Sequence, residues 1–153
     1  MESPIKEFDV EFKNFMVNEI SPSITYHGLY YVCAMQKDAE SEASVFGRLL
    51  YIGKSNEEGG IYGRYLKHSD KDEWKKQLGR GEYLGFFTAE IGCAADLVRV
   101  EAALIYAFKP PLNVQHAHMF GYPITKVNIS NIWGLKKTKE LLGRYLIENR
   151  GMQ

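Results

Sequence analysis

Glu101 is an acidic residue within a segment, residues 95–108, whose composition otherwise indicates a core-facing helix. On a helix, side chains three and four positions apart lie on the same face. The residues at those distances from Glu101 are all apolar: Leu97, Val98, Leu104 and Ile105. A carboxylate on such a face is costly unless it has a partner such as a metal ion. The sequence therefore predicts a buried acid with a functional role.

Other residue types that could do chemistry lie earlier in the chain. Arg64 and His68 are four residues apart in a predicted helix, so one helical face presents both side chains. A solvated helix face is the alternative interpretation of this pair. Tyr30 and Tyr51 fall in two predicted strands, where a tyrosine can also be an ordinary packing residue.

The elements that must position these residues follow from the pattern of the sequence. Aromatic and β-branched residues predict strands at 29–35, 48–52 and 83–91, and a long polar loop joins the first two. Apolar spacing predicts helices at 61–68, 72–78 and 96–108. The last helix must end before Pro110 and Pro111, since proline cannot donate a helical hydrogen bond.

The two ends of the chain are predicted to be largely helical. Apolar residues at three- and four-residue spacing predict an amphipathic helix over about residues 5–18. Residues 114–134 are rich in loop signals and leave room for one short strand. The spacing of leucines and a tyrosine then predicts a last helix over residues 135–149.

Composition limits the class of protein. A chain of 153 residues with 45% hydrophobic and 25% charged residues suits a single globular domain, residues 1–153. Nineteen basic and nineteen acidic residues give no net charge, so nucleic-acid binding would require local basic patches. The N-terminus lacks signal-peptide features, and no apolar run is long enough to span a membrane, so we expect a cytoplasmic protein without a membrane partner.

An ordered set of residues resembles the GIY-YIG nuclease superfamily. The set comprises two tripeptides, Gly28-Leu29-Tyr30 and Tyr51-Ile52-Gly53, followed by Arg64, Glu101 and Asn113. Either tripeptide alone is weak evidence of a resemblance. The stronger evidence is the order of the whole set relative to the predicted strands and helices. Leu29 replaces the isoleucine of the family name, and the twenty residues between Tyr30 and Tyr51 suggest an enlarged hairpin loop.

The resemblance implies a fold and an activity. It covers residues 28–113 as a catalytic core and leaves residues 114–153 as a C-terminal extension. The implied fold is an α/β (α+β) domain with a small central three-stranded antiparallel sheet flanked by helices. The implied function is that of an endonuclease that hydrolyses DNA phosphodiester bonds with a divalent cation, Mg²⁺ or Mn²⁺, bound by Glu101.

The same resemblance assigns roles to the remaining residues. Tyr30 would orient or deprotonate the attacking water and Tyr51 would support it. Because free tyrosine is only about 0.1% ionised at pH 7, a base role requires nearby positive charge to lower the pKa. Arg64 would clamp the scissile phosphate, and His68 would accept a proton from Tyr30 or bind phosphate.

Asn113 would hold the substrate or fix the loop beside the metal through its side-chain hydrogen bonds, although a simple turn residue is the alternative. Lys54 and Lys67 are candidate substrate-binding residues because they flank the proposed site.

A second function remains open, a non-cleaving nucleic-acid-binding module with a GIY-YIG-like fold. Hydrolysis of RNA or of branched DNA is a third, for which the sequence holds no distinguishing feature. A chain with one active centre must cut the two strands of a duplex in turn or act as a homodimer.

Overall fold

Two long strands rich in aromatic and β-branched residues form the centre of the sheet. In the computed structural model, which describes residues 5–41, 43–68, 70–130 and 143–148, β2 (Gly28–Lys37) and β3 (Ser44–Ser55) pair as an antiparallel hairpin. The strands are 10 and 12 residues long and account for most of the separation between Tyr30 and Tyr51. Strand length, more than an enlarged loop, therefore sets that spacing.

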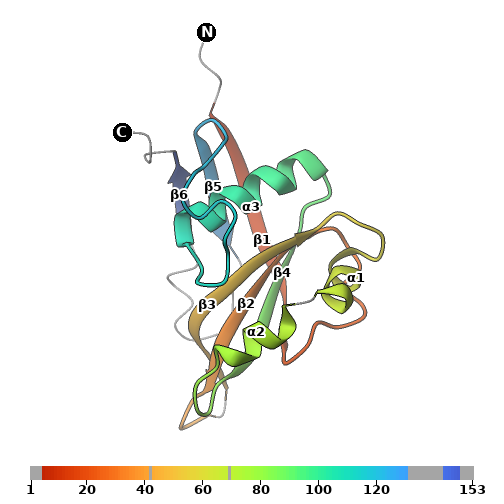
Figure 1. Ribbon diagram of the computed structural model, residues 1–153, viewed down its shortest axis with the longest axis vertical. Coiled ribbons are helices and arrows are strands. Elements are labelled where there is room, and N and C mark those ends of the chain that lie inside the picture. The colour runs from red at the N-terminus through yellow and green to blue at the C-terminus, as the bar shows by residue number, and fades with distance from the viewer. Residues whose placement is uncertain (1–4, 42, 69, 131–142, 149–153) are drawn as a thin grey trace.

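Four further strands extend the sheet beyond this hairpin. They are β4 (Tyr83–Glu90), β1 (Lys6–Val17), β5 (Thr125–Ser130) and β6 (Gly143–Ile147), and the sheet order is β3-β2-β4-β1-β5-β6. All neighbours are antiparallel except the parallel pair β1 and β5. Figure 1 shows these strands curling into a half-barrel. The predicted small three-stranded sheet is therefore wrong, because the described chain is a mixed α+β fold with six strands and three helices.

The helix predicted over residues 5–18 is wrong, since this segment forms β1. A register shift between Phe12 and Asn14 interrupts the pairing of β1 with β4. A bulge adds one residue and so reverses which face the following side chains point to. Phe12 and Phe15 both contact the ring of Phe87 for this reason. The interrupted alternation has the three-residue spacing of a helix, which misled the prediction.

The helix predicted over residues 135–149 is wrong at residues 143–147, which form the strand β6. Residues 131–142 and 149 lie outside the described part of the chain. Strand β6 pairs with β5, and the ring of Tyr145 on β6 packs against Phe108. The segment predicted as a C-terminal extension thus contributes two strands to the main sheet.

Helices cover both faces of the strands near the hairpin. One face of β2 packs against α1 (Gly60–Lys67) and α2 (Lys71–Lys76), where Trp74 is fully buried. The opposite face packs against α3 (Ala94–Phe108), which carries Glu101. Among the described residues, no helix has the combined length and apolar character needed to cross a bilayer.

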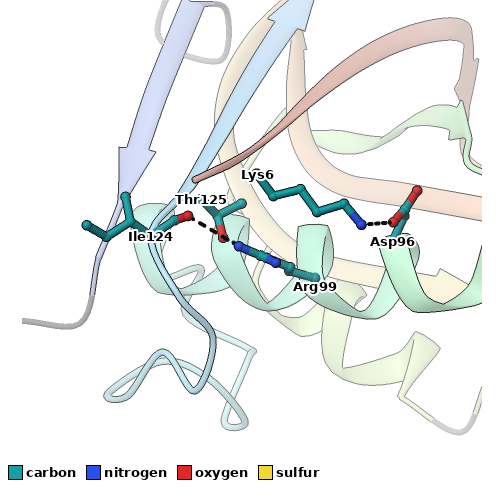
Figure 2. A network of polar contacts seen from close by, with 5 residues as sticks. All are labelled: Lys6, Asp96, Arg99, Ile124 and Thr125. Carbon is teal, nitrogen blue, oxygen red and sulfur yellow. Dashed lines mark hydrogen bonds and ion pairs between the residues drawn. The ribbon is translucent and has the colours of Figure 1, made fainter. Parts of the chain in front are cut away.

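Polar contacts attach α3 to the strands at the far end of the sheet (Figure 2). Arg99 on α3 donates from Nε to Thr125 Oγ1 at 2.8 Å and from Nη2 to the carbonyl oxygen of Ile124 at 3.2 Å. Lys6 Nζ on β1 lies 2.8 Å from Asp96 Oδ1 on the same helix, an exposed pair that contributes little by itself. These contacts help to hold the helix that carries Glu101 in a fixed position.

Candidate functional site

Six residues predicted from the sequence line one cavity of about 440 Å³. They come from β2, β3, α1, α3 and the loop after α3: Tyr30, Tyr51, Lys54, Arg64, Glu101 and Asn113. Two predicted residues do not line it. His68 contacts a cavity residue from behind, whereas Lys67 is exposed in the last turn of α1.

The cavity lies at the free edge of β3, which explains how helices on opposite faces of the sheet reach it. Asn113 caps this edge: its Nδ2 donates to the carbonyl oxygen of Ile52, and its Oδ1 accepts the Ile52 N–H, both at 2.9 Å. The amide thus replaces a neighbouring strand. Because both the Oδ1 and the Nδ2 of its side-chain amide bind the main chain of Ile52, Asn113 ties the loop after α3 to β3.

Glu101 is buried as predicted, with 7% of the residue exposed. Its partner in this structure is Lys54, whose Nζ lies 3.3 Å from Oε1. Burial raises the pKa of the Glu101 carboxyl above its ordinary value, and Lys54 acts in the opposite direction. The effect of burial exceeds that of Lys54, so this carboxyl takes up a proton at a higher pH than a free glutamate does.

Tyr30 and Tyr51 are diagonal neighbours on one face of the hairpin. Tyr30 pairs with Gly53 and Val32 pairs with Tyr51, and the two phenol rings lie 6.3 Å apart. Tyr30 is fully buried, and its hydroxyl has no hydrogen-bond partner within the described part of the chain. Such an unsatisfied group costs about 1–3 kcal/mol. The hydroxyl oxygen is closed off from solvent, so its missing hydrogen bond is a local cost of packing Tyr30 at this position.

The predicted lowering of the tyrosine pKa values is not found in the protein alone. Burial raises the pKa of Tyr30 far above its ordinary value, and the charge of Arg64 offsets only part of this effect. Burial also raises the pKa of Tyr51, with Glu101 acting in the same direction. Both phenols are therefore protonated at neutral pH and act as hydrogen-bonding groups in the protein as it stands.

His68 is placed to hold Tyr51, and it makes no hydrogen bond to Tyr30. Its Nδ1 accepts the backbone N–H of Asp70 at 3.1 Å, and its Nε2 lies 3.3 Å from the Tyr51 hydroxyl oxygen. Burial lowers the pKa of His68, and Arg64 adds to this effect. The neutral ring then carries its proton on Nε2 and donates it to Tyr51, which leaves the hydroxyl proton of Tyr51 available for the cavity.

The cavity is lined by charged side chains of both signs. Its lining residues include two cations and three anions, for a formal charge of −1: Lys54, Arg64, Glu57, Asp70 and Glu101. A divalent ion would change this charge to +1, which matches one phosphodiester anion. The described residues contain no cluster of three or more His, Cys, Asp or Glu side chains that could enclose a metal.

Seven lining residues were not predicted, and all lie close in sequence to one that was. They are Asn56, Glu57, Asp70, Ile105, Leu112, Val114 and Gln115. Ile105 is one helical turn after Glu101, and the others lie within three residues of Lys54, His68 or Asn113. Proximity to a motif residue was the only available signal, because none of the seven belongs to a motif itself.

Comparisons of this chain with protein-family models, curated proteins and solved structures find no match. No family is assigned by them.

Proposed function

We propose that this protein is a divalent-metal-dependent endonuclease that hydrolyses phosphodiester bonds in DNA. One observation carries the proposal: residues selected by their order in the sequence, and separated by up to 83 positions, line the same cavity. A carboxylate can hold a divalent cation, a guanidinium and an ammonium can stabilise charge on phosphate oxygens, and phenols can orient a water, all of which support phosphodiester hydrolysis. That these residues correspond to the GIY-YIG set is itself part of the proposal.

Glu101, as a buried carboxylate on the cavity wall, would hold a hydrated Mg²⁺ or Mn²⁺. Such an ion supplies charge neutralisation and a more acidic bound water. Lys54 would move from Glu101 to a substrate oxygen, since its side chain is one-third exposed and flexible.

Arg64 would bind the scissile phosphate. Its side chain lines the cavity from α1, and a guanidinium can donate two parallel hydrogen bonds to phosphate oxygens. The same charge favours the build-up of negative charge during hydrolysis.

Tyr30 and Tyr51 would orient the attacking water. Both hydroxyls are protonated in the protein alone, so each can donate or accept a hydrogen bond. The hydroxyl of Tyr30 is closed off from solvent in this structure, so its ring would have to shift to reach that water. His68 fixes the direction of the Tyr51 hydroxyl through its Nε2, and the packing of Tyr30 against the hairpin fixes the other ring. We assign to these residues positioning and hydrogen bonding in place of the general-base role considered from the sequence.

A non-cleaving nucleic-acid-binding module is the second candidate. The contact of Lys54 with Glu101 favours it, because a lysine that stays on the carboxylate would occupy the place of a metal. Binding without chemistry does not explain why a buried acid is retained beside a phosphate site, so we rank this candidate second.

The metal requirement separates the two candidates. Purified protein is incubated with supercoiled plasmid in Mg²⁺, in Mn²⁺ and in chelator, and the products are resolved on a gel. The nuclease proposal predicts nicked circles before linear product in the presence of either metal and none in chelator. Retarded but intact plasmid in every condition would support the binding module instead.

A further inference from the structure

A second, smaller pocket of about 150 Å³ lies on the side of the sheet that α1 and α2 cover. Its floor consists of three buried apolar side chains: Trp74, Leu84 and Phe86. The other lining residues are partly or fully exposed and comprise one tyrosine, one amide and three charged side chains: Asn18, Tyr65, Lys71, Asp72 and Lys75. None of these residues has a role in the proposed cleavage.

Tyr65 is the aromatic ring of this pocket that reaches its opening. Its ring lies within 20° of parallel to that of Trp74, with the ring centres 6.5 Å apart, and meets Phe86 edge-on at 5.7 Å. Lys71 Nζ lies 4.5 Å from the centre of the Tyr65 ring, a cation–π distance. Buried neighbours and one ammonium group therefore hold this ring in place.

Asn18 contributes an amide to the pocket from the turn after β1. Its backbone N–H donates to the carbonyl oxygen of Leu84 at 2.8 Å, which fixes the position of the residue. Its side-chain amide has no hydrogen-bond partner within the described part of the chain. This amide is therefore available to a ligand.

The charges around the pocket balance. Lys71 and Lys75 line it together with Asp72. Burial raises the pKa of Tyr65, and the charge of Glu19 adds to this effect, so Glu19 also lies near the pocket. Two lysines against two acids give little net attraction for a phosphate, which favours a neutral ligand with a flat face and polar edges.

We propose that this pocket binds one unpaired nucleobase of the DNA substrate, stacked on Tyr65. Every base has a face that stacks on an aromatic ring, and amide, ammonium and carboxylate groups can pair with its polar edge. A volume of about 150 Å³ is below the roughly 300–1,000 Å³ of pockets for drug-sized ligands, so it suits a single ring system in preference to a base pair. A base within a duplex is stacked and must first be flipped out.

Trp74 connects this pocket to the catalytic cavity. Its ring centre lies 5.8 Å from that of Tyr51, which lines the cavity, and 6.5 Å from that of Tyr65. Arg64 and Tyr65 are adjacent on α1, and the first lines the cavity while the second lines the pocket. The inference rests on the proposed function, and it adds a substrate class, DNA with unpaired nucleotides, that the sequence leaves open.

Binding affinities test the inference without requiring cleavage. A labelled single-stranded thymidine oligonucleotide is compared with one of the same length in which abasic residues replace the thymidines, so that the two differ in bases and share their phosphates. Each is titrated with protein in Ca²⁺, an oxygen-liganded substitute for Mg²⁺, and followed by fluorescence anisotropy. Wild-type protein should bind the thymidine oligonucleotide about tenfold more tightly, the scale of one stacked base.

Tyr65→Ala should abolish this preference without changing the affinity for the abasic oligonucleotide, which also shows that the variant is folded. Tyr65→Phe keeps the ring and should keep the preference. Asn18→Gly is a second variant with little risk to the fold, because Asn18 has a positive φ that glycine adopts readily. It should reduce the preference by removing the amide.

Tyr122→Ala serves as the matched control, because Tyr122 is a half-buried tyrosine that lines neither the cavity nor the pocket. The inference is overturned if wild-type protein binds both oligonucleotides equally, prefers the abasic one, binds neither, or keeps its preference in both Tyr65→Ala and Asn18→Gly. A protein that shows the preference but nicks no plasmid in Mg²⁺ or Mn²⁺ contradicts the proposed function and leaves the base pocket standing. Nicking without any preference contradicts the base pocket alone.

Discussion

The phenol ring of Tyr30 lies directly over Gly53, its cross-strand neighbour, so closely that a Cβ on Gly53 would overlap the ring. The glycine of Tyr51-Ile52-Gly53 is therefore explained by packing: it makes room for the tyrosine of Gly28-Leu29-Tyr30. Gly28 has an equally specific reason, because a Cβ there would overlap the carbonyl oxygen of Ala89 on β4. The two tripeptides form one interlocked unit that places both phenols.

Gly53→Ala should displace the Tyr30 ring from the cavity wall. Overpacking a buried position costs about 1–3 kcal/mol, so we expect a loss of that size in the free energy of unfolding and a lower cleavage rate. Urea denaturation and plasmid nicking measure the two effects. Gly92→Ala is the control, since nothing lies within 4 Å of a Cβ there. Equal effects of the two substitutions would show that Tyr30 does not depend on Gly53.

Asn113→Ala should destabilise the protein, because the N–H and carbonyl groups of Ile52 lose their partners at the edge of β3. We expect the free energy of unfolding to fall by about 1–3 kcal/mol. Gln115→Ala, two residues away in the same loop, removes an exposed amide without a described partner and should change stability by less than about 0.5 kcal/mol. Unchanged stability in Asn113→Ala, with weaker DNA binding, would instead assign Asn113 to the substrate.

Lys54→Met should shift the acid side of the cleavage profile to higher pH. Metal binding requires the ionised form of Glu101, whose pKa is raised by burial and lowered by Lys54, so removal of the lysine leaves only the raising effect. The profile of initial rate against pH measures the shift. Lys126→Met, an exposed lysine on β5, should leave the acid side in place. A shift to lower pH in Lys54→Met would contradict this account of the Glu101 environment.

His68→Asn should reduce the loss in the free energy of unfolding that occurs when the pH is lowered. The folded-state pKa of His68 lies below the ordinary value of about 6.5. Its contribution to the free energy of unfolding is therefore fully present above pH ~6.5 and is lost as the pH falls toward the folded-state pKa. Asparagine can accept the Asp70 N–H but does not titrate. The raised pKa of Glu101 acts with the opposite sign, so the comparison is between variant and wild type.

Urea denaturation above and below pH ~6.5 measures this difference. Wild-type protein should lose more stability on acidification than His68→Asn. An identical loss in both proteins would mean that His68 titrates normally in the folded state.

The predictable parts of the fold are those with local signals. The strands β2 and β4 and the helix α3 lie close to their predicted positions because aromatic, β-branched and helical spacing is uninterrupted there. The sheet beyond β4 depends on information that no short segment contains. The bulge of β1 is set by its pairing with β4, and β6 is a strand because β5 offers it an edge.

More of the candidate site than of the sheet could be predicted from the sequence. Glu101 stood out because a single acid interrupts an apolar helical face, and the tripeptides placed Tyr30 and Tyr51 on paired strands. Asp70 and Glu57 were missed because an isolated acid in a loop has no pattern, although both affect the charge of the cavity. The contact between His68 and Tyr51 was also missed, because the fold of the chain after α1 sets that distance.

Nicking of supercoiled plasmid by Glu101→Gln, beside wild type and the exposed-acid control Glu11→Gln, tests the central claim most directly. Glutamine keeps the shape of the buried side chain but removes the charge that would hold a cation. We predict that wild type and Glu11→Gln nick the plasmid in Mg²⁺ or Mn²⁺, and that Glu101→Gln, folded by circular dichroism, does not. Nicking by Glu101→Gln at the wild-type rate would contradict the account.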